Sequence, residues 1–247
     1  MKNRYNFGAV LSAVVLVCCG ALILSQKVNA AGEGKITGTV KFEGTPPHMR
    51  GIDMSKDPWC VKQHVNNPAH LELTVVGPGG GLANVAVYIQ GWTGPAVVYK
   101  TVPEFDQKNC MYVPHVMAVD PGQTFKVVTS DQTAHNIHPE PNPMVNIPWN
   151  QSQPPGAAPI EKSWKNPEMI PVQCNIHPWM HGWHVVVKGP YAVTDDSGKY
   201  TIDNVPPGTY TLAAWHEGTT ADNATTETAK VTVSSGQAAT ADFSFKK

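Results

Sequence analysis

Most apolar residues of this chain fall in short runs where they alternate with polar residues, and no run follows helical spacing for more than two turns. Alternation with a period of two is the pattern of a half-buried strand. Such runs cover residues 35–42, 71–76, 82–90, 111–119, 124–128, 169–173, 183–187, 191–194, 199–202, 209–215, 229–233 and 239–245. Turn sequences such as Asp120-Pro121-Gly122 and Pro206-Pro207-Gly208 separate several of them. The sequence therefore predicts an all-β protein.

Residues 1–30 have the pattern of a secretory signal peptide. Lys2 and Arg4 precede a mostly apolar stretch, and Val28-Asn29-Ala30 offers small residues for cleavage. We expect cleavage near Ala31 and a periplasmic or secreted protein with no membrane span. The apolar stretch is also long enough to cross a bilayer, so a retained membrane anchor is the alternative.

The charge balance excludes one class of partner. The chain has 18 basic and 19 acidic residues, and residues 1–30 contain three of the basic and none of the acidic ones. The rest of the chain therefore has 15 basic and 19 acidic residues, a net charge of −4. Proteins that bind nucleic acid present a basic patch, so we do not expect a nucleic-acid partner.

The strongest chemical signal is the segment Cys174-Asn175-Ile176-His177-Pro178-Trp179-Met180. It presents a thiolate, an imidazole and a thioether with the spacing Cys-x2-His-x2-Met. A blue (type 1) copper site has two His ligands and one Cys ligand in a plane, with a weak axial Met. His135, just after a predicted strand, supplies the second imidazole. We expect these four side chains to hold one mononuclear copper ion that cycles between Cu(I) and Cu(II).

Zinc is the alternative metal, because it also accepts Cys and His ligands. It rarely uses Met, however, and a closed zinc site would need a further Cys or His.

Residues 97–188, with Ala-His-Asn-Ile-His at 134–138 and the segment at 174–180, resemble the amicyanin-like members of the cupredoxin family. The resemblance implies a Greek-key β-sandwich in which His135 and His177 are the nitrogen ligands, Cys174 the thiolate and Met180 the axial ligand.

The same resemblance implies roles for residues around the ligands. Asn136 would link the two copper loops, and the ring edge of His177 would face solvent and pass the electron. Pro178 and Trp179 would form an apolar rim around that ring, a surface suited to transient docking of a redox protein as electron donor or acceptor. The long, Pro-rich stretch between His135 and Cys174 departs from the family pattern.

Three cysteines remain once residues 1–30 are removed, namely Cys60, Cys110 and Cys174. If Cys174 binds copper, the other two are natural disulfide partners in an exported protein. Closing a loop of about 50 residues would stabilise the fold by roughly 4 kcal/mol in the chain-entropy model. Two buried free thiols are the alternative.

Five further histidines raise the question of a second metal site: His115, His138, His181, His184 and His216. Single histidines are most often surface or core residues, and we favour that interpretation here. His138 and His181 lie closest in sequence to the expected copper ligands.

The flanks of the copper region resemble a second family. Residues 194–202 and 205–212 are similar to a carboxypeptidase regulatory-like domain, a prealbumin-like β-sandwich, and residues 36–40 and 82–88 are similar to its first strands. We therefore expect the copper domain to be inserted into this sandwich. The expected segments are a signal peptide at 1–30, the first part of the sandwich at 31–96, the copper domain at 97–188 and the rest of the sandwich at 189–247.

Together these features predict single-electron transfer between redox proteins rather than catalysis. A trigonal site held by the protein needs to change little when an electron moves, and it leaves little room for a substrate. One competing hypothesis is a copper-dependent oxidoreductase, which would need another copper site or an open coordination position. Another is a module that binds copper or a glycan without redox chemistry.

Overall fold

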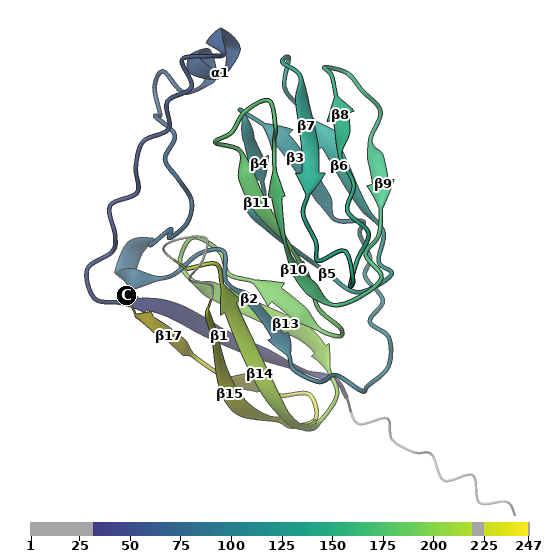
Figure 1. Cartoon of the computed structure of the whole chain (residues 1–247). Coiled ribbons are helices and arrows are strands. Elements are labelled where there is room, and N and C mark those ends of the chain that lie inside the picture. Colours follow the sequence, from purple (N-terminus) through teal and green to yellow (C-terminus); the bar gives the residue numbers. More distant parts are fainter. Residues whose placement is uncertain (1–31, 219–224, 247) are drawn as a thin grey trace, which may run out of the picture. The chain divides into compact units, whose positions relative to one another are not determined.

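The computed structural model describes residues 32–218 and 225–246 (Figure 1). The expected signal peptide at residues 1–30 lies outside these ranges. The described residues cluster as one compact unit. Within the described ranges, no helix is both long enough and apolar enough to cross a membrane.

The described residues form seventeen strands, one short α-helix and one 3-10 helix, which confirms the predicted all-β fold class. In chain order, the elements are β1 (Gly34–Glu43), α1 (Pro58–Gln63), η1 (Pro78–Gly80), β2 (Ala86–Ile89), β3 (Glu104–Lys108), β4 (Met111–Val113), β5 (Val116–Val119), β6 (Phe125–Thr129), β7 (His135–Pro139), β8 (Gln151–Gln153), β9 (Ile160–Lys162), β10 (Glu168–Gln173), β11 (His181–Val186), β12 (Tyr191–Val193), β13 (Lys199–Val205), β14 (Gly208–His216), β15 (Thr225–Val233), β16 (Ala238–Thr240) and β17 (Phe243–Lys246).

One β-sandwich combines strands from both ends of the described chain. One of its sheets has the order β13-β1-β16, with β17 also paired to β1, and the other has the order β12-β2-β14-β15. Alternate residues of β1, including Ile36 and Val40, are buried, as the period-two pattern predicts. They share a core with Ile202 of β13 and Leu212 of β14, so the inner faces of the two sheets meet there.

A second β-sandwich is formed by β3 to β11. Its sheets have the orders β5-β11-β10-β7-β8 and β4-β3-β6-β9. Phe105 and Phe125 from one sheet and Ile137 and Ile170 from the other are fully buried in one core. This sandwich contains all the expected copper ligands or the loops that carry them.

β5 is buried on both faces, because a third apolar cluster lies on the side away from the second core. In that cluster Val116 and Val185 contact Ala86 and Trp215 of the first sandwich. The two sandwiches therefore share apolar surface within the compact unit.

Several predicted strands differ from the structure. The run 239–245 divides into β16 and β17. Residues 71–76 are irregular apart from an isolated bridge at Val76, so the strand prediction there was wrong. The predicted strand 82–90 shortens to Ala86–Ile89. The run 111–119 divides into β4 and β5 at Pro114, because proline has no N–H to donate to a sheet ladder.

The helix α1 begins where the sequence provides a cap. Asp57 accepts hydrogen bonds from the backbone N–H groups of Trp59 and Cys60, and Pro58 occupies the first turn, where a missing N–H costs nothing. The expected disulfide between Cys60 and Cys110 is present, with the two Cα atoms 5.7 Å apart. It fastens α1 to the turn between β3 and β4.

Candidate metal centre

Three adjacent strands of one sheet bring the expected ligands together. His135 opens β7, Cys174 follows β10, and Met180 immediately precedes β11. β10 pairs with both β7 and β11, so the loop 174–180 joins two neighbouring strands beside the start of a third. Two sequence segments about 40 residues apart therefore meet because of strand order.

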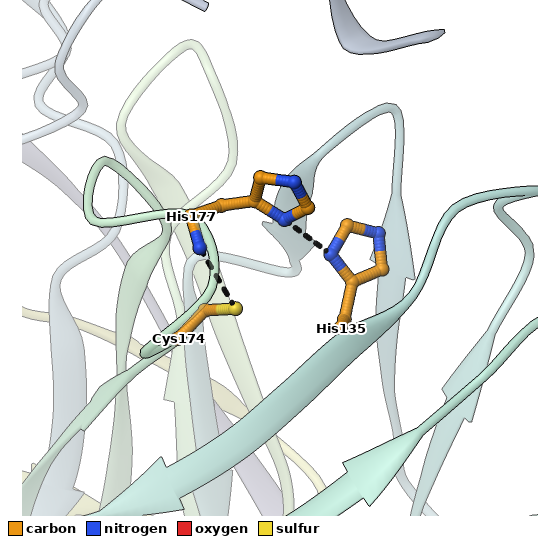
Figure 2. Close-up of side chains that lie close together, drawn as sticks. All are labelled: His135, Cys174 and His177. Atoms are coloured by element: carbon orange, nitrogen blue, oxygen red, sulfur yellow. Dashed lines mark hydrogen bonds between the residues drawn. The ribbon is translucent and has the colours of Figure 1, made fainter. Parts of the chain in front are cut away.

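Figure 2 shows the rings of His135 and His177 turned toward each other, with the Cys174 sulfur beside them. The two Nδ1 atoms are 2.9 Å apart, and one ligand atom from each of the three residues lies within 4.8 Å of the others. The Cys174 Sγ also accepts a hydrogen bond from the backbone N–H of His177 at 3.4 Å. All three residues are at most 3% exposed.

Met180 belongs to the same buried cluster as Cys174 and is 1% exposed. Two backbone hydrogen bonds close the loop between them: Cys174 N–H donates to Met180 O at 3.1 Å, and Met180 N–H donates to His177 O at 2.9 Å. This tight loop holds the three residues from the Cys-x2-His-x2-Met segment in a fixed relation.

Carboxylates hold the outer nitrogens of both imidazoles. His135 Nε2 donates to Asp131 Oδ2 at 2.8 Å, and His177 Nε2 donates to Asp57 Oδ2 at 3.1 Å. With the proton on Nε2, each ring presents an Nδ1 lone pair to the centre, and a carboxylate partner of this kind also orients a ligating ring.

The sequence analysis missed both carboxylates. Asp131 precedes His135 by four residues, which is a usable local signal. Asp57 lies 120 residues from His177 in sequence, so only the folded structure reveals that contact.

The surroundings of Cys174 favour its thiolate form. Burial raises the pKa of Cys174, but hydrogen bonds with His135 and His177 outweigh that effect and lower the pKa to about 5. The thiolate, rather than the thiol, binds metals, so the environment favours the form that a metal ion needs.

Asn136 ties the two ligand loops together. Its Oδ1 accepts hydrogen bonds from the backbone N–H of Asn175 at 2.7 Å and of Ile176 at 3.3 Å. Its Nδ2 donates to Asn175 Oδ1 at 3.0 Å and to Asn150 Oδ1 at 2.8 Å. The side chain is 4% exposed, so it makes these contacts away from solvent.

The expected solvent-facing ring edge of His177 is not found. The residue is 3% exposed, and its Nε2 contacts Asp57 and lies 3.9 Å from Cys60 Sγ. The segment carrying α1 covers this ring because the disulfide to Cys110 holds it there. The resemblance could not predict this, because it covers residues 97–188 and the covering segment, around α1, lies before them in the chain.

The proposed docking residues are only partly exposed. Pro178 is exposed, whereas Trp179 is half-buried and donates from Nε1 to Cys110 O at 3.1 Å. The Trp179 ring lies 4.9 Å from the His177 ring, centroid to centroid. Ile176, which is 50% exposed, adds an apolar side chain to the same loop.

The donor set fits a copper ion. Two converging imidazole nitrogens, one thiolate and a buried thioether match the ligand types of a type 1 site. Cys174 is the free cysteine among the described residues, so no disulfide competes for its sulfur.

The fold and the site thus define an all-β protein with two β-sandwiches and a buried cluster of two His, one Cys and one Met. Residues 181–246 match the carboxypeptidase regulatory-like domain family. No curated protein matches the chain.

Several solved structures are similar to part of the chain. A purple cupredoxin from Nitrosopumilus maritimus is 16% identical to this chain. The match covers 34% of this chain and 99% of the cupredoxin, with a TM-score of 0.30. A reduced amicyanin mutant is 17% identical, with coverage of 41% and 98% and a TM-score of 0.32. A Cu-containing nitrite reductase from Thermus scotoductus SA-01 is 16% identical over 40% of this chain, with a TM-score of 0.32, and only 25% of that enzyme is matched.

Proposed function

We propose that this chain is an exported mononuclear copper protein that carries single electrons between redox proteins. The observation that supports it most is the buried convergence of His135 Nδ1, His177 Nδ1 and the Cys174 thiolate. A buried site with these converging donors leaves little room for a substrate, which favours electron transfer over bond-making.

Copper, when bound, would supply a one-electron couple between Cu(II) and Cu(I). The chain's part is to hold the donors still. Asp131 and Asp57 fix the rings of the two histidines, and the short loop closed at Met180 fixes the thiolate. Because these contacts do not depend on the charge of an ion, the donors need to move little when the charge changes.

The same proposal includes transient docking of a donor and an acceptor protein at the ligand loop. Ile176 and Pro178 are exposed there, and the Trp179 ring lies against His177. Replacing Trp179 with Ala is expected to slow electron transfer to a small haem protein. Trp149→Ala, a half-buried tryptophan elsewhere on this sandwich, is the matched control. Equal electron-transfer rates in both variants would show that Trp179 takes no part in the transfer.

The decisive experiment adds Cu(II) to the purified protein and records its visible and electron paramagnetic resonance spectra. We expect an intense thiolate-to-copper band that a reductant bleaches and an oxidant restores. Cys174→Ser should abolish that band while the far-UV circular dichroism stays the same. A colourless wild-type protein that binds only Zn2+ would refute the proposal.

A further inference from the structure

A second group of metal-ligating side chains lies next to the axial methionine in sequence. One ligand atom from each of His115, His181 and Glu217 lies within 4.8 Å of the others. His115 and Glu217 are 4% and 2% exposed, while His181 is half-buried. None of these three residues is one of the expected copper ligands.

Strand register explains how the group forms. β11 runs parallel to β5 with Trp183 opposite Val116, and Trp183 N–H donates to His115 O at 2.8 Å. His181 and Trp183 are two residues apart on β11, so their side chains point to the same face. Glu217 directly follows β14, and its Oε2 accepts a hydrogen bond from Trp183 Nε1 at 2.8 Å.

The hydrogen bonds inside the group leave several of its polar atoms without a partner. His115 Nε2 contacts Glu217 Oε1, while His115 Nδ1 faces Glu72 Oε2 at 3.5 Å. His115 Nδ1 and Glu72 Oε2 are buried without a hydrogen-bond partner among the described residues. Within the same described ranges, the ring of His181 takes part in no hydrogen bond, although it lies 5.3 Å from the His115 ring, centroid to centroid.

We propose that His115, His181 and Glu217 form a second metal site, which binds a divalent transition-metal ion such as Zn2+. Two imidazoles and one carboxylate are a common three-ligand set for zinc, with the fourth position left to water. His115 would bind through Nε2, the nitrogen beside Glu217, and would keep its proton on Nδ1, facing Glu72. A carboxylate behind a ligating histidine is the usual arrangement that orients the ring.

The electrostatics of the pocket favour a cation. Burial by itself lowers the pKa of His115, but the hydrogen bond to Glu217 and the negative charges of Glu217 and Glu72 raise it, to about 9. Two carboxylates therefore face one another across a single histidine, and a divalent ion would neutralise both.

An ion can reach the group from solvent. His181 lines a surface cavity of about 530 Å³, which Leu71, the neighbour of Glu72, also lines. The site would join residues of β11, the β4–β5 turn and the end of β14, and so link the two sandwiches. It does not depend on the copper proposal.

The competing explanation is a buried ion pair between His115 and Glu217 that needs no metal. That explanation assigns no role to His181.

The test is zinc binding by the full chain in the Cys174→Ser background, which lacks the thiolate of the first site. Bound Zn2+ per chain and its dissociation constant are measured with a competing chelator, and Co2+ is used as a spectroscopic probe.

We expect the Cys174→Ser protein to bind a Zn2+ ion whose affinity falls about 10- to 100-fold on adding either His181→Ala or Glu217→Gln. Adding His48→Ala, an exposed histidine outside both sites, should change nothing. His181→Ala removes no hydrogen bond, so it keeps the test valid if Glu217→Gln fails to fold. Zinc binding that is absent, or that is equal in the His181→Ala and His48→Ala proteins, would overturn the proposal. Copper spectra that do not depend on Cys174 would instead refute the first proposal alone.

Discussion

Replacing Asn136 with Ala tests whether one buried amide holds the two ligand loops in place. The substitution removes the acceptor of two backbone N–H groups and the donor to Asn175 Oδ1 and Asn150 Oδ1. It leaves the metal ligands themselves unchanged. Asn136 Oδ1 also accepts a hydrogen bond from Cys174 Sγ at 3.4 Å, so an effect on the centre can act through that sulfur as well as through the position of the 174–180 loop.

The expected loss of stability follows from these contacts. A net contribution of about 1 kcal/mol applies to the bond from Asn136 Nδ2 at 2.8 Å. The part-buried N–H of Asn175, bonded to Asn136 at 2.7 Å, is left without a partner, which costs about 1–2 kcal/mol. We therefore expect the free energy of unfolding to fall by about 2–3 kcal/mol.

Urea denaturation of the metal-free protein measures this difference. Asn150→Ala is the matched control, because its side chain is exposed and accepts only the bond from Asn136 among the described residues. The control should lose less than about 1 kcal/mol. In addition, we expect the Asn136→Ala protein to bind copper about 10- to 100-fold more weakly, since an orienting contact has been removed.

Two results would refute this reasoning. Equal urea midpoints for Asn136→Ala and Asn150→Ala would show that the amide does not stabilise the loop. A normal copper affinity in a destabilised Asn136→Ala protein would show that the loop keeps its ligand geometry without the amide.

Three further predictions concern stability and redox properties. Replacing both Cys60 and Cys110 with Ala removes a link between residues 50 apart and should cost about 4 kcal/mol in urea denaturation; an unchanged midpoint would contradict this. Asp57→Asn removes a negative charge bonded to His177, which should make the free energy of copper reduction more favourable by on the order of 1 kcal/mol and so raise the reduction potential in voltammetry, whereas the exposed Asp53→Asn should not. Burial lowers the pKa of His184 to about 3. Below about pH 6.5 this histidine therefore binds a proton in the unfolded chain but not in the folded chain. The free energy of unfolding should fall by about 1.4 kcal/mol per pH unit from pH 6.5 toward 3. In His184→Leu this part of the slope should vanish; an identical slope would refute the assignment.

Alternation along the chain predicted most strands but not their partners. β1 pairs with β13, β16 and β17, which lie more than 150 residues away, and no local pattern encodes those contacts. The strand predicted at 71–76 failed for a related reason. Val76 packs against the core of the first sandwich, while Leu71 N–H donates a single backbone hydrogen bond to Arg50 O, and neither contact requires a ladder.

The site was predictable to the extent that ligand type and spacing define it. Cys174, His177 and Met180 belong to one short segment, and His135 lies in a second loop that resembles its family counterpart. The carboxylates behind the histidines and the acid of the second cluster have no such signature. Asp57 and Glu217 each meet their histidine from more than 100 residues away in sequence.

The disulfide connects the features that sequence alone could not place. Cys60 lies in the helix that Asp57 caps, and Asp57 holds His177. Cys110 N–H donates at 2.7 Å to Asp131, which holds His135. One covalent link therefore joins the supports of both imidazoles, so breaking it should disturb the metal centre more than the loss of stability alone would. Cys60 and Asp57 both contact His177, so this link also holds the segment that covers the ring, while Ile176 and Pro178 of the ligand loop stay exposed.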